Sequence, residues 1–410
     1  MGFVPTLDSG GFFLFHKQRN ANRGRCRNMK KTPKLIFVLT ALLFCYGFLL
    51  GGQQLVLTTV SEQFGLGALG MGTMIAVMYL SALLTPAVMG TIADRVGKKR
   101  ILVIFAILFG TGCLLAAFSP ALAVFLVSMF FIGAGYSVCE SLTSAVCVEV
   151  DPQNGARYIN LTQCLLSVGA IVGPIVMSNL PAMPFDTWRL LYIFCGIPLI
   201  LIGLWLIRLP FPKAELVKEK TLIPKPLLTS PVFLALVVSM ILYLGLETGF
   251  GYFIEILFAL KIDGVTLSAY GISAYWAGMA LSRFIYSLRP YRPRTAVRLS
   301  LIAAAVCFLG LILVRSGIFC VLLCALVGAS YAPVWSTLVA GAAERFPQYK
   351  ASATGIMSAS CGMGGILFPV LMGAMVEAMD IRIGFVILMV TAGIGAVLTF
   401  VLSNNKAKTE

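Results

Sequence analysis

The stretch Gly133-Ala134-Gly135-Tyr136 returns 195 positions later as Gly328-Ala329-Ser330-Tyr331, and it opens a repeat of 133–177 in 328–372 that needs no gap. Thirteen of the 45 aligned positions are identical. Beyond the opening motif, the identities that chance explains poorly in an apolar chain are Glu149 with Glu344, Pro152-Gln153 with Pro347-Gln348, Gly169 with Gly364, Pro174 with Pro369 and Met177 with Met372. Duplicated hydrophobic halves that hold a substrate between them are typical of secondary transporters. The repeat therefore predicts a carrier.

The composition agrees with a membrane protein. Of the 410 residues, 59% are hydrophobic and only 11% are charged, which is far from the balance of a soluble domain. Twelve segments of about 20 apolar residues can be placed, each long enough to cross a hydrocarbon core of about 30 Å. We therefore predict an all-α polytopic membrane protein with twelve transmembrane helices in two pseudo-symmetric six-helix halves. The predicted spans lie near 35–59, 70–91, 101–119, 121–148, 158–180, 189–209, 231–259, 268–288, 296–315, 317–343, 351–379 and 383–403.

The positive charge is distributed as in a protein of the cell membrane. The net charge is +15, but 27 of the 31 Lys and Arg residues fall on one side of the twelve-span arrangement. The four on the other side are Arg189, Lys261, Arg315 and Arg382. This positive-inside bias predicts that both termini and the segment 210–230 are cytoplasmic in the inner membrane. The partner of this charge is then anionic lipid and not nucleic acid.

The chain divides at one clear internal boundary, a linker rich in proline and charge over 210–230. It separates an N-terminal six-helix half, 35–209, from a C-terminal half, 231–403. Residues 1–34 are predicted to be a disordered basic cytoplasmic segment, and 404–410 a cytoplasmic tail. Met29-Lys30-Lys31 resembles an ordinary start, so 1–28 is expected to be either a disordered extension or the result of a start site assigned too far upstream.

Histidine, which many enzyme and metal sites require, is missing from the predicted spans. The eleven cysteines are scattered without a CxxC pair, and the only histidine, His16, lies before the first span. A Ser-His-Asp triad or a His-ligated metal inside the membrane is therefore excluded. We predict a monomer without cofactor or metal, and not an enzyme.

The segment Gly90-Thr91-Ile92-Ala93-Asp94-Arg95-Val96-Gly97-Lys98-Lys99-Arg100 resembles the loop between spans two and three of the major facilitator superfamily. With twelve spans and a half-repeat, the resemblance covers about 30–403. It implies that Asp94 caps the amino end of span eleven near Ala351-Ser352 and closes the cytoplasmic side. In the second half, Gly278, Ser282 and Arg283 answer Gly90, Asp94 and Arg95. The predicted gate residues are Gly90, Asp94, Arg95, Gly97, Arg283 and the span-end charges Glu149, Arg157 and Glu344.

Three further passages are similar to the fucose:proton symporter-like sugar carriers within that superfamily. They are Glu140 with Asn160-Leu161-Thr162-Gln163, the run Tyr243-Leu244-Gly245-Leu246-Glu247, and Tyr275-Trp276-Ala277-Gly278-Met279-Ala280-Leu281-Ser282-Arg283-Phe284. One departure bears on mechanism. Where those symporters have Asn-Asp in span one, this chain has Gln53-Gln54, which removes a protonatable group from that span.

Carboxylates at membrane depth are costly and are therefore candidates for function. Glu140 lies in predicted span four, and its repeat mate is Trp335, so the pseudo-symmetry predicts an acid and an indole on facing walls of one cavity. Polar side chains that could bind hydroxyl groups lie on neighbouring spans, although such side chains also join helices in lipid. The predicted proton-coupling residues are Glu140 and Glu247. The predicted substrate-binding residues are Gln53, Gln54, Glu140, Asn160, Gln163, Tyr275 and Trp335.

These observations predict a secondary active transporter that moves a small polar solute, a sugar, by alternating access in symport with protons. The alternative is efflux of a drug or metabolite by proton antiport. Gly169, Gly173 and Pro174 partly resemble the span-five signature of drug antiporters, but Met177-Ser178 replaces its closing glycines. The solute, the direction of flux and the coupling ion are left open by the sequence.

Overall fold

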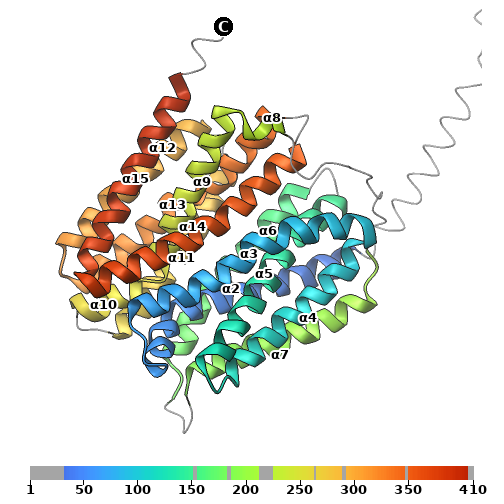
Figure 1. The fold of residues 1–410 in the computed structure, drawn as a ribbon, viewed down its shortest axis with the longest axis horizontal. Coiled ribbons are helices and arrows are strands. Elements are labelled where there is room, and N and C mark those ends of the chain that lie inside the picture. The colour runs from blue at the N-terminus through green and yellow to red at the C-terminus, as the bar shows by residue number, and fades with distance from the viewer. Residues whose placement is uncertain are drawn as a thin grey trace, which may run out of the picture.

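The protein is a bundle of long α-helices in a computed structural model, which describes residues 32–150, 155–181, 186–211, 225–262, 265–288, 292–346 and 350–404. Figure 1 shows the helices as two groups lying side by side, α2 to α7 and α9 to α15. No strand occurs in the described ranges. The helices are α2 (Thr32–Gln63), α3 (Ala68–Val96), α4 (Lys98–Ala117), α5 (Leu122–Val150), α6 (Gly155–Ser178), α7 (Trp188–Arg208), α8 (Lys225–Leu228), α9 (Pro231–Gly251), α10 (Ile254–Ile262), α11 (Val265–Leu288), α12 (Pro293–Leu313), α13 (Gly317–Arg345), α14 (Lys350–Ala378) and α15 (Ile381–Asn404).

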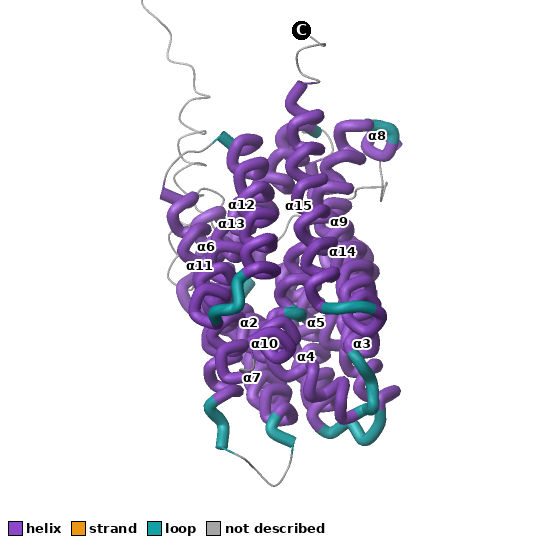
Figure 2. The backbone as a smooth tube through the Cα atoms, turned by 90° about the vertical axis from the view of Figure 1, so that its left-hand side faces the viewer, coloured by secondary structure: helices purple, strands orange, loops and turns teal. Residues whose placement is uncertain are grey.

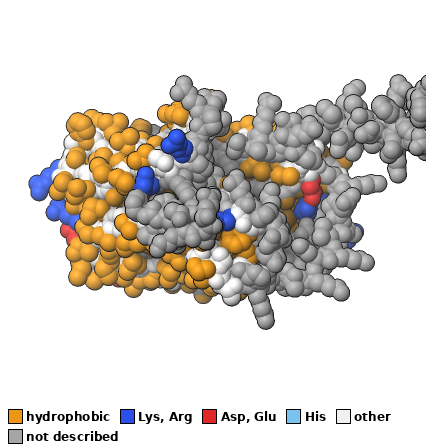
Figure 3. Space-filling model, turned by 90° about the horizontal axis from the view of Figure 1, so that it is seen from above, with side chains coloured by type: hydrophobic (Ala, Val, Ile, Leu, Met, Phe, Trp, Pro, Cys, Tyr) orange, Lys and Arg blue, Asp and Glu red, His pale blue; other side chains and the backbone are white. Residues whose placement is uncertain are grey.

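Eleven helices of the described chain are long and apolar enough to cross a membrane. The twelfth expected span is α11, which has 24 residues but a more polar composition that includes Ser268, Ser273 and Arg283. Figure 2 shows the helices running alongside one another with connecting loops at both ends, and Figure 3 shows a surface on which hydrophobic side chains prevail. The predicted all-α polytopic fold is therefore confirmed.

The repeat found in the sequence is a repeat of helix contacts. A Cβ on Gly133 of α5 would lie 2.0 Å from the carbonyl oxygen of Met78 on α3. A Cβ on its mate Gly328 of α13 would lie 1.8 Å from the carbonyl oxygen of Tyr275 on α11. Only glycine permits both approaches, which explains why the same residue stands at both positions.

A second pair of duplicated glycines makes the same kind of contact. A Cβ on Gly169 of α6 would lie 2.3 Å from the carbonyl oxygen of Phe44 on α2, and a Cβ on Gly364 of α14 would lie 2.3 Å from that of Ile241 on α9. The fifth long helix of each group thus packs on the first in the same way. The two groups are two copies of one packing scheme.

One predicted span differs from the structure. The sequence suggested a continuous helix over 231–259, but α9 ends at Gly251 and α10 begins at Ile254 after a turn at Tyr252 and Phe253. The backbone comes so close to α2 here that a Cβ on Gly251 would lie 2.5 Å from the amide nitrogen of Gln54. Because Gly245, Gly249 and Gly251 also weaken the helix, the apolar run breaks at this point.

The two groups meet chiefly through α3 against α14 and α6 against α11. We call the end of the bundle near Gly97 and Leu209 the linker end, and the opposite end the distal end. Near the distal end, a Cβ on Gly72 would lie 2.2 Å from the carbonyl oxygen of Pro369, so α3 and α14 touch. Toward the linker end, a Cβ on Gly90 or Gly355 would meet nothing within 4 Å. Among the described residues, α3 and α14 are therefore in contact near the distal end, and they are apart at Gly90 and Gly355, toward the linker end.

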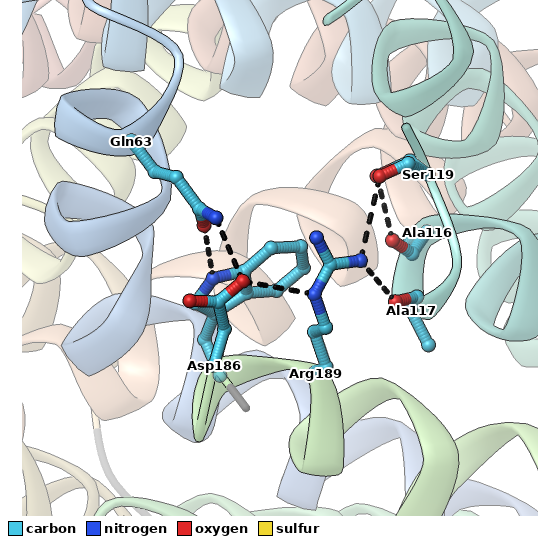
Figure 4. A network of polar contacts seen from close by, with 7 residues as sticks. Gln63, Ala116, Ala117, Ser119, Asp186 and Arg189 are labelled. Carbon is cyan, nitrogen blue, oxygen red and sulfur yellow. Dashed lines mark hydrogen bonds and ion pairs between the residues drawn. The ribbon is translucent and has the colours of Figure 1, made fainter. Parts of the chain in front are cut away.

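A polar network ties three segments of the first group together at the distal end (Figure 4). Gln63 at the end of α2 donates to Asp186 Oδ2 at 2.7 Å and accepts from Trp188 Nε1 at 2.6 Å. Arg189 donates to Asp186 at 3.0 Å and to the carbonyl oxygen of Ala117 at 2.6 Å. The guanidinium also lies 4.5 Å from the Trp188 ring. The end of α2, the end of α4 and the start of α7 are therefore joined.

Candidate substrate site

A cavity of about 260 Å³ lies between the two groups of helices, and it is close to the lower end of the usual size of small-molecule sites, about 300 Å³. Side chains from α2, α3, α5 and α6 line one wall, and side chains from α9, α11, α13 and α14 line the other. The main aromatic and polar lining residues are Tyr46, Gln54, Tyr79, Tyr136, Glu140, Gln163, Tyr243, Glu247, Tyr252, Trp276, Arg283 and Trp335.

The acid predicted on span four faces this cavity. Glu140 of α5 accepts a hydrogen bond of 3.0 Å from Gln163 Nε2 of α6. Its repeat mate Trp335 of α13 lines the cavity from the other group. The structure thus brings together Glu140, Gln163 and Trp335. A carboxylate is an acceptor for hydroxyl groups, and an indole offers a flat face to a ring.

The second predicted acid lies on the opposite wall. Glu247 of α9 accepts a hydrogen bond from the hydroxyl of Tyr243, one turn earlier on the same helix. Arg283 of α11 also lines the cavity, and it donates to Ser167 Oγ of α6 at 3.4 Å. The sequence analysis placed Arg283 among the gate residues; the structure places it on the cavity wall, where it adds a cation to the site.

The two glutamines of span one have different positions. Gln54 is buried, lines the cavity and accepts a hydrogen bond of 2.9 Å from Trp276 Nε1 of α11, which joins the two groups of helices. Gln53 points into the first group instead, where its amide donates to Tyr192 at 3.3 Å and to the sulfur of Met129 at 3.7 Å. The structure therefore places Gln54, and not Gln53, at the cavity.

Tyr275 also lies away from the cavity. Its side chain is fully buried, its ring packs against Phe250 and Tyr331, and its hydroxyl has no partner among the described residues. The next residue, Trp276, occupies the cavity wall in its place. The two residues are adjacent, so the rotation of α11 about its axis determines which of them faces the cavity. The sequence pattern did not predict that rotation.

A group of tyrosines was missed by the sequence analysis. Tyr46 of α2 stacks on Tyr136 of α5 with ring centroids 4.5 Å apart and planes at 9°, and Tyr79 of α3 meets the edge of Tyr136 at 6.4 Å. All three line the cavity. Tyr136 belongs to the repeated Gly-Ala-Gly-Tyr motif, which was a signal that could have marked it.

The sequence model of the Major Facilitator Superfamily matches residues 39–361 of this chain. A second, overlapping match covers residues 289–410. The chain belongs to the major facilitator superfamily. Members of this superfamily are transporters and not enzymes. The match therefore confirms the carrier that the repeat predicted.

Among proteins similar to this major facilitator, a D-xylose transporter of Levilactobacillus brevis is 27% identical over 161 residues, which cover 39% of this chain and 35% of that protein. The chain thus matches only about a third of the length of that relative. A putative glucose/galactose transporter of Helicobacter pylori is 23% identical over 375 residues, covering 85% of this chain and 91% of that protein. A crystal structure of the E. coli fucose:proton symporter has a TM-score of 0.66 at 15% identity, covering 91% of this chain and 99% of that chain. The last likeness establishes the shared fold.

The predicted gate of this major facilitator lies at the linker end and is described in part. Gly97 has φ +99°, a conformation that favours glycine and allows the reversal between α3 and α4. Glu149 of α5 forms an ion pair with Lys98, the first residue of α4. The side chains of Asp94, Arg95, Arg157, Glu344 and the predicted ligand Asn160 lie outside the described part of the chain.

Proposed function

We propose that this major facilitator carries a small neutral sugar across the cell membrane in symport with protons. The single observation that carries the proposal is the cavity between the groups, with Glu140 and Trp335 contributed from opposite walls. Hydroxyl groups suit the carboxylate, the amides and the tyrosines, and a sugar ring suits the aromatic faces. The names of its relatives, which mention D-xylose, glucose, galactose and fucose, support the same solute class.

The proposed mechanism is alternating access. The halves 35–209 and 231–403 rock about the central cavity, so that it opens first to one side of the membrane and then to the other. The linker end carries most of the positive charge, so it is assigned to the cytoplasm, and both termini with it. The described conformation is then open to the cytoplasm, with anionic lipids around the basic end and one chain as the working unit.

The gate at the linker end is proposed to act as the resemblance implies. Asp94 caps the start of α14 when the cytoplasmic side closes, because free backbone N–H groups at a helix start favour an anion. Gly90 and Gly97 allow the approach and the reversal. The ion pair of Glu149 with Lys98, and the charges Arg95, Arg157 and Glu344, are made and broken as the halves move.

Glu140 is proposed to carry the coupling proton, with Glu247 as the second titratable acid of the cavity. Span one has no acid to do so, because Gln53-Gln54 stands there. When Glu140 is protonated, it donates to the solute as well as accepting from Gln163, so the affinity for sugar depends on the proton. Replacement of Glu140 by glutamine keeps the shape and removes the exchangeable proton.

The test is a melting-temperature measurement on purified protein with D-xylose, D-glucose, D-galactose, L-fucose and, as the exporter control, tetraphenylphosphonium. A ligand that binds the folded state raises the melting temperature by mass action. We expect a rise with one or a few sugars. Proteoliposomes with that sugar should then show uptake driven by an inward proton gradient, and Glu140→Gln should abolish accumulation above equilibrium.

Two results would refute this proposal. A shift with tetraphenylphosphonium and with none of the sugars would support the efflux reading. Full proton-driven accumulation in Glu140→Gln would remove Glu140 from coupling. Trp205, which is 47% exposed on the outside of α7, gives the matched control Trp205→Phe, which should leave sugar binding unchanged.

A further inference from the structure

A groove of about 500 Å³ lies between α12 and α15, on the outside of the second group of helices. Figure 1 shows both helices on the side of that group that is turned away from the first group. Each helix contributes one face, with residues spaced by three or four positions. The lining residues are Arg298, Ile302, Ala305, Val306 and Leu309 of α12 and Met389, Gly393, Ala396 and Val397 of α15. Only Arg298 among them is polar.

Gly393 keeps the groove open. A Cβ on Gly393 would meet nothing within 4 Å, whereas a Cβ on Gly395, two residues later, would lie 3.1 Å from the side chain of Leu301 on α12. The two helices therefore touch at Gly395, which is buried, and stand apart over the outward face that holds Gly393.

The first group has no such opening at the described glycines of the corresponding helix pair. Its third and last long helices, α4 and α7, correspond to α12 and α15 of the second group. A Cβ on Gly110 would lie 2.7 Å from the carbonyl oxygen of Gly196, and a Cβ on Gly203 would lie 2.7 Å from Cγ1 of Ile107. The pair α4 and α7 is thus in close contact at two levels. The groove marks a difference between the two copies of the packing scheme, so the shared fold does not explain it.

The length of the groove matches one leaflet of a bilayer. The positions of Arg298 and Leu309 differ by 11 residues, which is about 16 Å along an α-helix. Half of a hydrocarbon core of about 30 Å is about 15 Å. Arg298 lies in the second turn of α12, which begins at Pro293, so it stands at the linker end of the groove. Apolar residues continue from there toward the middle of the bundle, as an acyl chain requires.

The charge of Arg298 indicates the kind of headgroup. The positive-inside bias assigns the linker end to the cytoplasm, and anionic lipids are concentrated in the cytoplasmic leaflet. A guanidinium has five N–H donors and matches the oxygens of a phosphate in pairs. Neither α12 nor α15 carries an aspartate or a glutamate, so no carboxylate on either helix repels a phosphate here.

A second copy of the chain suits this face less well than a lipid. A two-fold contact brings the same face of both copies together, so each Arg298 would approach its counterpart. Because α12 and α15 have no acid, these two charges would have no compensation from either helix at membrane depth. A helix seated on the face would also cross both leaflets, whereas the groove ends near Leu309 and Met389.

We propose that the groove between α12 and α15 binds one acyl chain of an anionic phospholipid, whose phosphate contacts Arg298. The chain lies beside Gly393 and supplies the packing that α4 and α7 supply to each other directly in the first group. An anionic lipid is thus a specific part of the second group. The choice of the cytoplasmic leaflet rests on the proposed orientation, but the site does not depend on which solute the carrier moves.

The first experiment measures the melting temperature of the purified protein during titration with palmitoyl-oleoyl phosphatidylglycerol. Phosphatidylcholine with the same chains is the neutral comparison, since any lipid that binds the folded state raises the melting temperature. We expect phosphatidylglycerol to bind about fivefold more tightly, which corresponds to about 1 kcal/mol for one arginine near an anionic lipid. Arg298→Gln should remove this preference, and Arg298→Lys should retain part of it. Arg208→Gln, in the last turn of α7, is the matched control and should keep the preference.

The second set of variants fills the groove without a change of charge. Gly393→Leu places a side chain in the open space, so it should abolish the response to both lipids. Its melting temperature without lipid should equal or exceed that of the wild type, because leucine also favours the helix more than glycine does, and this checks that the variant folds. Gly393→Ala adds only one methyl group and should retain most of the response.

The third experiment locates the lipid by photo-crosslinking in vesicles of three parts phosphatidylcholine to one part phosphatidylglycerol. Benzoylphenylalanine replaces Val306, which is 64% exposed at the edge of the groove, or Leu201, which is 59% exposed on α7 and serves as the control. We expect the adducts at position 306 to be enriched in phosphatidylglycerol at least threefold over the vesicle composition. Adducts at position 201 should follow the composition, and Arg298→Gln should bring position 306 to the same ratio.

The contrary results are specific. Equal lipid ratios at positions 306 and 201, or a wild-type lipid response in Gly393→Leu, would refute the site. Crosslinks from position 306 to a second copy of the chain in place of lipid would make this face an interface between copies and would refute it as well. A lipid response without preference for phosphatidylglycerol would overturn the contact with Arg298. None of these measurements uses a sugar, so a failure of the proposed function leaves the lipid site standing.

Discussion

The carboxylate of Glu377, at the end of α14, accepts a hydrogen bond of 2.9 Å from the backbone N–H of Leu69, at the start of α3. The cap residue of α3, Gly67, provides no side-chain hydrogen bond, so the acid that serves this helix start comes from the other half. A Cβ on Gly67 would lie 2.2 Å from the Glu377 carboxylate, and glycine leaves the required room. Asp94 is expected to serve the start of α14 at the opposite end of the same helix pair. The resemblance therefore predicts an acid at each end of the antiparallel pair α3 and α14, of which the structure describes the Glu377 end.

Loss of the distal acid should loosen the distal closure. We expect Glu377→Ala to cost about 0.5–2 kcal/mol of closure, the usual effect of losing a helix cap, and to shift the protein toward outward-open states. Paramagnetic labels at positions 118 and 379, whose native side chains are 70% and 65% exposed, measure this as a longer or broader distance. The control is Glu62→Ala, an exposed acid near the same end. Equal distances in Glu377→Ala and the wild type would contradict the prediction.

The duplicated glycines should be far more sensitive than other glycines of the same helices. Gly328→Ala places a Cβ 1.8 Å from the carbonyl oxygen of Tyr275, so α13 and α11 must separate, and overpacking of this kind typically costs about 1–3 kcal/mol. Gly341→Ala in the same helix meets nothing within 4 Å and should be neutral or stabilising. Melting temperatures in detergent compare the two. A similar loss in both variants would mean that the close approach is unimportant.

The fold was predictable because it rests on long-range regularities. An arrangement of two similar groups of long apolar helices is indicated by three features of the sequence: the span length, the one-sided placement of Lys and Arg, and the repeat that pairs Gly133 with Gly328. The structure shows this arrangement of helices. The break at Gly251 was not predictable from hydropathy, since the residues on both sides of it are apolar. It follows from a tertiary contact with Gln54 that no local pattern records.

The sequence predicted which types of residue form the site, but not which of two adjacent side chains points into the cavity. The acids Glu140 and Glu247 line the cavity because a carboxylate at membrane depth is costly unless it faces the interior of the bundle or a water-filled cavity. Gln53 and Gln54, and likewise Tyr275 and Trp276, are neighbours that differ only in the angle at which they leave the helix. Both residues of each pair are buried, and the helices carry apolar residues on every face. The sequence pattern therefore does not show which of the two neighbours points into the cavity.

The bond between Gln54 and Trp276 should contribute to the sugar site. Trp276→Phe removes the indole N–H and leaves the buried amide oxygen of Gln54 without its donor, which typically costs about 1–3 kcal/mol. Some of this cost should appear as a lower melting temperature, and some as a weaker response to sugar. The control is Trp205→Phe on the outer face of α7. Unchanged melting and sugar response in Trp276→Phe would show that the bond is not formed in the working protein.

The distal network around Asp186 predicts a pH-dependent contribution to stability. Hydrogen bonds from Gln63 and Arg189 hold the pKa of the Asp186 carboxyl below its usual range. A depressed pKa stabilises the folded state at pH values above the unfolded value of about 3.9, and the contribution is lost as the pH falls through the folded value. Because the Asp186 side chain is 39% exposed, the contribution should not exceed about 1 kcal/mol.

Asp186→Asn tests this directly, because it keeps an acceptor for Gln63 and removes the charge that Arg189 faces. At pH 7 we expect a slightly lower melting temperature than in the wild type, and the difference should vanish as the pH is lowered toward 3. High salt should shrink it as well. Asp380→Asn is the matched control at the same end. The Asp380 and Arg382 side chains pair only at 4.0 Å and both are half exposed, and asparagine keeps an acceptor for the Arg382 backbone N–H, which donates to Asp380 Oδ1 at 3.0 Å. A difference that persisted at low pH would assign the effect of Asp186→Asn to shape and not to charge.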